Sequence, residues 1–183
     1  MISSNVIFQK ISEELSQNII KFIKGDEKEA YKSVLASLAE SRKVRTVFVQ
    51  KRPVEKQISW MLQSLKLKTG ILVADQVLQI WLLKAKTKML IGFLDKLGIE
   101  HDGEGSVEGD LPESLDADKL KAAVDEMIEN NTEEEVIVYL TLFQAQKADG
   151  WAELTALIDS DERLTFWYYV CLLYTSDAAD EVS

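Results

Sequence analysis

The sequence predicts an all-α fold of about eight helices, arranged as a helical bundle or a short helical-repeat array with one long acidic loop. Apolar residues recur at spacings of three and four along most of the 183-residue chain, which is typical of amphipathic helices. The chain holds two prolines and eight glycines and is 46% hydrophobic, so disordered and collagen-like classes are excluded. A chain of this length can bury a sizeable core.

Residues 1–98 are expected to form a helical N-terminal part. One apolar stripe predicts a first helix that Gly25 ends, through Phe8, Ile11, Leu15, Ile19 and Ile23. Asp26 is placed to cap a second helix, whose inward face would comprise Ala30, Tyr31, Val34, Leu35 and Leu38. Val44, Val47 and Phe48 then fit continued helix, although Val47 and Val49 also fit a strand. Pro53 must break this segment because it lacks a backbone N–H.

Two triplets of helices are expected to follow, separated by a glycine-rich acidic loop at residues 99–115. Their ranges are 54–67, 71–85 and 87–98, then 116–130, 132–146 and 149–159. Asp116, Thr132 and Asp149 are expected N-caps, and Thr132 with Glu135 matches a capping box. The apolar phase of the two triplets coincides at an offset of 62 residues. This coincidence fits a degenerate three-helix repeat, but any two amphipathic helices of similar length can be brought into phase.

Charge divides the chain into a basic part up to about residue 70 and an acidic remainder. Residues 1–70 hold 13 bases and 7 acids, a net charge of +6, whereas residues 71–170 hold 8 bases and 21 acids, a net charge of −13. The C-terminal helical set at 116–170 is therefore acidic. Such a division fits contact between the two parts, separate partners for each, or unselected variation of the surface.

The final residues, 171–183, are expected to be a non-native tail. Cys171 to Glu181 reads CLLYTSDAADE, which resembles a translated transposon-end adapter of sequencing libraries at all eleven positions. The tail carries the only cysteine and three of the 31 acids, so the remainder has 28 acids, 21 bases and a net charge of −7. Without it the chain has no disulfide, thiolate nucleophile or cysteine metal ligand.

A cluster of six cations within 15 residues is the first candidate site, and it comprises Arg42, Lys43, Arg45, Lys51, Arg52 and Lys56. Lysine and arginine clusters neutralise phosphates, and the apolar Val47 and Phe48 between them could orient the segment on nucleic acid or an anionic membrane. Because the chain as a whole is acidic, we do not expect nucleic acid as the partner. The favoured interpretation is a solvated face that pairs with the acidic half.

The acidic loop is the second candidate, as a metal site formed by Glu100, His101, Asp102 and Glu104. Its oxygens and its glycine at the sixth position match part of a calcium-binding loop. The bidentate glutamate at the twelfth position is missing, because Leu111 stands there. A connector between two helical sets is the favoured alternative, and His101, the single histidine, is expected to be a solvated loop residue.

No catalytic residue, cofactor-binding residue or cofactor is predicted, because no nucleophile elbow, phosphate loop or dinucleotide glycine pattern occurs. The favoured function is a non-enzymatic protein–protein interaction or scaffold module with an unidentified protein partner. The alternatives are an enzyme or metal-binding domain around His101, and binding of nucleic acid or an anionic surface through residues 42–56. No membrane span is predicted, and a cytoplasmic location is expected.

Overall fold

The computed structural model describes residues 2–165 and Tyr168, and within them the all-α prediction is confirmed. The described residues contain no strand, and their only β pairing is an isolated bridge between His101 and Val107. The chain divides into two compact units between Ala85 and Lys86, whereas the expected boundary followed residue 98. We call Ser3–Ala85 the basic unit and the described residues from Lys86 onward the acidic unit.

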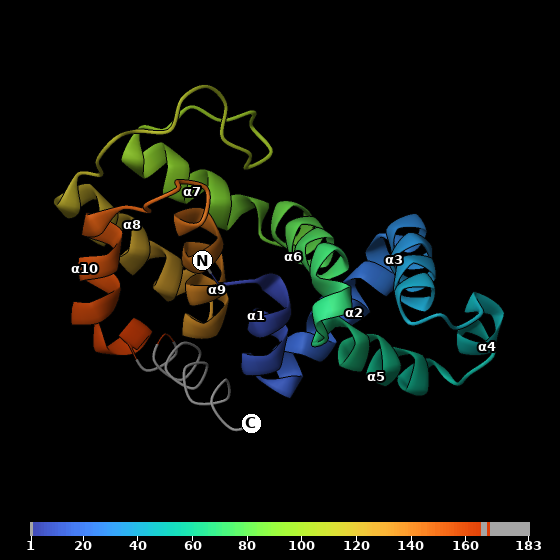
Figure 1. Cartoon of the computed structure of the whole chain (residues 1–183). Helices are drawn as coiled ribbons and strands as arrows, with labels where there is room; N and C mark the ends of the chain where they lie inside the picture. Colours follow the sequence, from blue (N-terminus) through green and yellow to red (C-terminus); the bar gives the residue numbers. More distant parts are fainter. Residues whose placement is uncertain (1, 166–167, 169–183) are drawn as a thin grey trace. The chain divides into compact units, whose positions relative to one another are not determined.

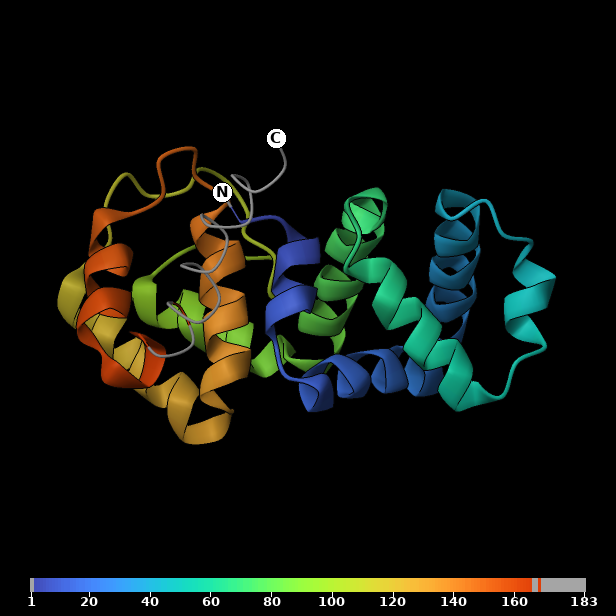
Figure 2. The ribbon, with the colours of Figure 1, turned by 60° about the horizontal axis from the view of Figure 1, so that its bottom comes forward.

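Seven helical segments build the basic unit (Figure 1). They are α1 (Ser4–Lys10), α2 (Glu13–Asp26), α3 (Lys28–Ser41), α4 (Thr46–Gln50), α5 (Val54–Leu65), the 3₁₀ helix η1 (Lys68–Gly70) and α6 (Ile71–Ala85). Helix α2 packs against α3, α5 and α6, and α1 packs against α6 (Figure 2). The core contains the fully buried Phe8, Ile19, Leu38 and Met61, so the apolar faces of these helices meet one another.

The prediction of a single first helix through Ile23 is wrong, because the chain breaks at Ile11 and Ser12. Both residues have extended ψ angles, 155° and 152°, and separate α1 from α2. The Ser12 side chain caps α2 by accepting a hydrogen bond from the Leu15 amide at 3.1 Å. Ile11 nevertheless stays buried, which is why the apolar stripe reads as continuous. Gly25 lies inside α2, which ends at Asp26.

The expected continuation of helix beyond residue 41 is confirmed only in part, because residues 46–50 are helical rather than strand but are not continuous with the preceding helix. Helix α3 ends at Ser41, and a separate five-residue helix, α4, begins at Thr46. Glu27 rather than Asp26 occupies the N-cap of α3, without a side-chain capping bond. Pro53 immediately precedes α5, as its missing N–H requires.

The acidic unit consists of α7 (Thr87–Leu97), α8 (Ala117–Asn130), α9 (Glu133–Gln144) and α10 (Ala152–Ser160). Helix α8 packs against each of the other three. An aromatic cluster lies in the core: Phe93 meets Phe143 edge to face at 5.1 Å, and Phe143 stacks on Trp151 at 4.7 Å. Burial raises the pKa of the neighbouring Tyr139 well above its usual range.

The predicted caps of the acidic unit are partly confirmed. Asp116 caps α8 by accepting from the amides of Asp118 and Lys119, and Thr132 forms the predicted capping box with Glu135. Asp149 does not cap α10, because that helix begins at Ala152 with Trp151 as its N-cap. The aromatic side chain of Trp151 is buried, so packing sets this start rather than a capping hydrogen bond.

The number of helices exceeds the prediction of about eight: the described residues hold eleven, nine of them with seven or more residues. The additional elements arise from the break at Ser12 and from the short α4 and η1. The predicted repeat remains a prediction, and its first triplet would be α5, α6 and α7, which the two units divide. Among the described residues, no helix is long and apolar enough to span a membrane.

Candidate interaction surface

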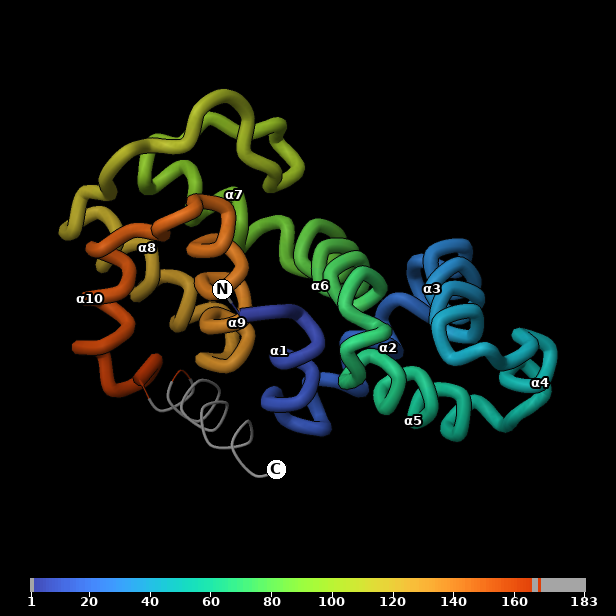
Figure 3. The backbone as a smooth tube through the Cα atoms, in the orientation of Figure 1, coloured from blue at the N-terminus to red at the C-terminus, as the bar shows by residue number. Residues whose placement is uncertain are grey.

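The segment that joins α3 to α5 exposes cations and apolar side chains together. Within residues 42–56, Val47, Phe48 and Val54 are 45%, 58% and 45% exposed. We call the exposed cationic and apolar side chains of this segment the α4 surface: Arg42, Lys43, Arg45, Val47, Phe48, Lys51, Arg52, Val54 and Lys56. Gln50, Pro53 and Glu55 are exposed in the same segment. Figures 1 and 3 place α4 at the edge of the basic unit, where its chain turns between α3 and α5.

The α4 surface is fixed to the core of its unit at two points. Val49, on the inner side of α4, is fully buried and anchors this short helix. The Gln57 side chain donates hydrogen bonds to the carbonyls of Gln50 and Arg52, at 3.0 and 2.8 Å. Its own carbonyl accepts from the Tyr31 hydroxyl at 3.1 Å, and burial raises the pKa of Tyr31. The exposed residues are therefore presented by a segment whose backbone is held in place.

Lys43 adopts a conformation that normally favours glycine. Its φ of 53° lies in the left-handed region, and it is the only non-glycine residue with positive φ among those the structure describes. The amides of Lys43 and Val44 bond to the carbonyls of Glu40 and Ala39, which closes α3 with a Schellman motif. A lysine at this place costs backbone strain that glycine would avoid. The strained residue lies between α3 and α4, at the start of the α4 surface.

The cations of the α4 surface have no carboxylate partner inside the basic unit. Arg42 donates to the Ser64 hydroxyl at 3.2 Å and lies 6.0 Å from the centre of the Trp60 ring. The ion pairs of the described residues include none with Arg42, Lys43, Arg45, Lys51, Arg52 or Lys56. The sequence interpretation of a solvated face is consistent with this exposure, and pairing with the acidic half remains a prediction.

The second candidate, the acidic loop, uses its carboxylates to shape its own backbone. Asp102 accepts hydrogen bonds from the amides of Glu104 and Ser106, at 2.7 and 3.0 Å, and these bonds lower the pKa of Asp102. Gly105 has a φ of 98°, and a Cβ there would lie 2.9 Å from the Leu90 side chain. The loop is therefore held against α7 by a close contact that requires glycine.

His101 contacts different groups from those that the metal hypothesis requires. Its Nε2 lies 3.0 Å from the Asp95 carboxylate of α7, and its Nδ1 accepts the Gly103 amide at 3.1 Å. Both ring nitrogens are thus engaged away from Glu100 and Glu104. No group of three or more His, Cys, Asp or Glu side chains among the described residues is arranged to hold a metal ion.

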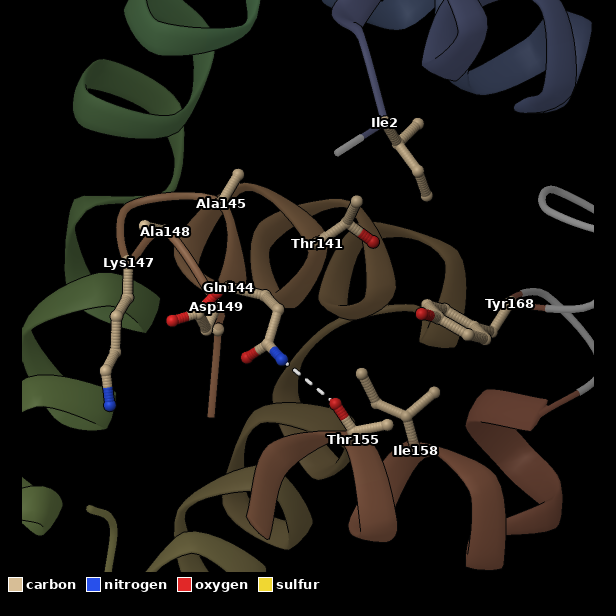
Figure 4. Close-up of a pocket in the computed structure, with 11 residues that line it drawn as sticks. Ile2, Thr141, Gln144, Ala145, Lys147, Ala148, Asp149, Thr155, Ile158 and Tyr168 are labelled. Carbon is tan, nitrogen blue, oxygen red and sulfur yellow. Dashed lines mark hydrogen bonds between the residues drawn. The ribbon is translucent and has the colours of Figure 1, made fainter. Parts of the chain in front are cut away.

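A pocket of about 290 Å³ in the acidic unit is lined by Gln144, Lys147 and Thr155, whose polar groups bond to the protein itself, and by Asp149 among others (Figure 4). The Gln144 amide donates to the Trp151 carbonyl and the Thr155 hydroxyl, both at 3.0 Å, and accepts the Trp151 amide. The Lys147 ammonium donates a hydrogen bond to the Glu113 carbonyl. The Gln144 bonds join α9 to α10, and the Lys147 bond attaches the connection between these helices to the loop at residues 99–115. These groups therefore have a structural role.

A second hollow, of about 490 Å³, lies between α2 and α5 in the basic unit. Its charged lining is balanced, because it contains two acids, Glu13 and Glu55, and two bases, Lys21 and Lys66. This balance gives no preference for a cationic or an anionic ligand.

The fold and these sites define an all-α protein with a basic, partly apolar surface on one unit. No protein-family model, curated protein or solved structure matches this chain. Sequence analysis identified the cations and Val47 and Phe48, but it missed the positioning residues Tyr31 and Gln57. Their hydrogen bond spans 26 positions of the chain, so no local signal marks it.

Proposed function

We propose that the protein is a non-enzymatic interaction module whose basic unit binds an anionic partner through the α4 surface. One observation carries the proposal: unpaired cations and exposed apolar side chains share a short segment that Val49 and Gln57 fix to the core. The favoured sequence hypothesis was a protein–protein interaction or scaffold module, and one of its alternatives was binding of nucleic acid or an anionic surface through the basic residues 42–56. The proposal joins these two hypotheses.

In the free protein the exposed groups of the α4 surface lack two favourable interactions, burial of the apolar side chains and pairing of the cations with carboxylates. Burial of a phenylalanine side chain is worth about 1.5–3 kcal/mol, and Phe48 at 58% exposure gains only part of this. Cations without a neighbouring carboxylate attract an anionic partner more strongly than paired cations do. A partner that supplies both an apolar environment and negative charge therefore satisfies both kinds of group at once.

The charge of the basic unit favours the same partner. Residues 3–85 hold 14 bases and 8 acids, a net charge of +6, although the whole chain is acidic. Attraction between exposed charges is screened beyond about 8–10 Å at physiological salt. A ligand on the α4 surface therefore responds mainly to the cations around it rather than to the net charge of the chain.

The test compares two double variants that change the net charge equally. Arg45→Glu with Lys51→Glu reverses two cations of the α4 surface, and Lys21→Glu with Lys28→Glu reverses two exposed cations on α2 and α3. Binding is measured by titration with three anionic probes: poly-L-glutamate, a single-stranded oligonucleotide, and vesicles that contain phosphatidylserine. Circular dichroism confirms that each variant is folded.

We expect the wild-type chain to bind at least one probe and to lose affinity as salt is added. The α4-surface variant should bind that probe roughly tenfold more weakly or worse, since each cation near an anionic surface contributes about 1 kcal/mol. The α2 and α3 variant should keep most of its affinity. If no probe binds, or if both variants weaken equally, the proposal is wrong.

A further inference from the structure

We infer that the anionic partner of the α4 surface is the headgroup region of an anionic lipid bilayer, into which Phe48 and Val47 insert. This inference rests on the proposed function and names its partner. Three observations carry it: the kind of side chains exposed, the shape of the segment that exposes them, and the arrangement of cations around them.

The exposed side chains suit a bilayer interface better than a nucleic acid. Phe48 is the only large aromatic residue among the exposed apolar side chains that the structure describes, and Val47 and Val54 are aliphatic. Single-stranded nucleic acids bind to successive aromatic platforms, because their bases stack on rings. Aliphatic side chains offer no such face, but they partition with phenylalanine into the boundary between headgroups and acyl chains.

The segment that carries these side chains lies at the edge of the basic unit and does not form a groove around a ligand. Helix α4 has five residues, and it lies at the edge of its unit where the chain turns (Figures 1 and 2). A partner helix is usually bound in an apolar groove formed by two or more longer elements. A short helix at a turn, with Val49 directed into the core and Phe48 and Val47 directed to solvent, can instead enter a soft interface.

Cations flank the apolar residues on both sides along the chain. Lys43 and Arg45 precede Val47, and Lys51 and Arg52 follow Phe48, each of them exposed. Insertion of the apolar pair would bring these four side chains to the level of lipid phosphates and carboxylates, where lysine and arginine are favoured. Gln57 holds the backbone of Gln50 and Arg52, so little further ordering is needed for binding.

The strained Lys43 fits this arrangement. Glycine would close α3 at lower conformational cost, but it would remove one cation from the edge of the α4 surface. Local strain that is retained where a simpler residue would serve points to a role for the side chain. On a bilayer, that role is a contact with an anionic headgroup.

The test uses vesicles of phosphatidylcholine with and without roughly one third phosphatidylserine, a fraction that gives a strongly negative surface. Co-flotation measures binding of the full chain, of Phe48→Ser and of a matched control, Leu72→Ser. Leu72 is 82% exposed on α6 of the same unit and lies outside the α4 surface. Neither substitution removes a buried side chain, so both variants should fold.

We expect binding only to the vesicles that contain phosphatidylserine. Phe48→Ser should weaken this binding by roughly tenfold, the equivalent of losing partial burial of one phenylalanine, and Leu72→Ser should leave it unchanged. A Phe48→Trp variant reports insertion into the bilayer directly, through tryptophan fluorescence. Its fluorescence, taken as a difference from the wild-type chain, should shift to shorter wavelength on these vesicles and not with poly-L-glutamate.

Each alternative result has a distinct meaning. Binding to poly-L-glutamate or the oligonucleotide without binding to vesicles would overturn the lipid inference and leave the proposed function standing. Vesicle binding that Phe48→Ser does not weaken, or that Leu72→Ser weakens equally, would overturn insertion at α4. Failure to bind any of the three probes would overturn both.

Discussion

The basic and acidic units differ in how they treat charge and apolar surface. All five large apolar side chains that the structure finds exposed, Val47, Phe48, Val54, Leu67 and Leu72, belong to the basic unit. In the acidic unit Lys86 pairs with Glu135, Lys96 with Glu126, and Arg163 with Asp125 and Asp161. The acidic unit therefore satisfies these cations internally, whereas the basic unit leaves the α4 cations available.

The two units also differ at residues with left-handed backbone. The acidic unit places glycine at each such position that the structure describes, among them Gly98 at the end of α7 and Gly150 before α10. The basic unit places Lys43 at the end of α3. The basic unit therefore combines backbone strain with exposed apolar side chains along one segment, whereas the described acidic unit has neither feature.

The largest expected effect concerns the aromatic core of the acidic unit. Trp151→Ala should lower the free energy of unfolding by about 3–5 kcal/mol, because it removes a side chain that is 1% exposed and stacked on Phe143. It also leaves the Pro112 carbonyl without its indole donor at 2.9 Å. Urea unfolding measures the loss, and hydrogen exchange should locate it in α8–α10. The matched Phe48→Ala in the basic unit should change stability by less than about 0.5 kcal/mol.

The second prediction contrasts two glycines within the basic unit. A Cβ at Gly70 would lie 2.4 Å from the Ser64 carbonyl oxygen, so Gly70→Ala should destabilise by about 1–3 kcal/mol. Gly25 lies inside α2 with open space around it, and Gly25→Ala should stabilise by about 0.5–1 kcal/mol. Thermal denaturation compares the pair. A similar loss in both variants would contradict the close approach of η1 to α5.

The third prediction concerns the Arg163 ion pairs of the acidic unit. Arg163 lowers the pKa of Asp161 and Asp125 by direct hydrogen bonds and raises its own. Arg163→Met should cost about 1 kcal/mol at neutral pH, a modest value because Asp125 and Arg163 are more than a third exposed. Carboxyls whose pKa is lowered by folding contribute stability above their unfolded pKa and lose it as the pH falls through the folded pKa.

The difference between wild type and Arg163→Met should therefore be constant at neutral pH and shrink below about pH 4. Urea unfolding at a series of pH values measures it. A difference that stays constant into strongly acidic solution would show that Arg163 acts through packing alone.

The last prediction concerns the strained backbone at Lys43. Lys43→Gly and Lys43→Ala both remove the cation, but only glycine relieves the left-handed backbone strain, so the glycine variant should be more stable than the alanine variant by about 1 kcal/mol. Chemical denaturation compares the two. Equal stability would show that the end of α3 tolerates a side chain without strain, and it would remove one support for the lipid inference.

The sequence correctly predicted helices whose ends are set by residues close together in the chain. Helix α6 occupies the predicted range 71–85, and the Thr132 capping box lies where the sequence placed it. The Ser12 break was missed although Ser12, Glu13 and Glu14 form a favourable helix start, because the buried Ile11 kept the apolar period intact. The expected non-native tail from Cys171 lies outside the described residues.

The functional hypotheses depended more heavily on the fold. The sequence located the six cations of residues 42–56 and the acidic loop, but it could not say which carboxylates the folded chain leaves to bind a ligand. In the loop, Asp102 bonds to backbone amides and His101 to Asp95, since the turn brings these groups together. The protein partner and cytoplasmic location that the sequence favoured remain predictions.

The sequence by itself determined the helical class, several helix caps and the opposite charge of the two parts, because each follows from composition or from residues within a few positions of one another. Tertiary structure alone decided that α7 packs with α8, that Val49 is buried while Phe48 is exposed, and that Gln57 fixes the α4 segment. These features depend on contacts between residues distant in the chain, where burial of apolar surface outweighs local preference.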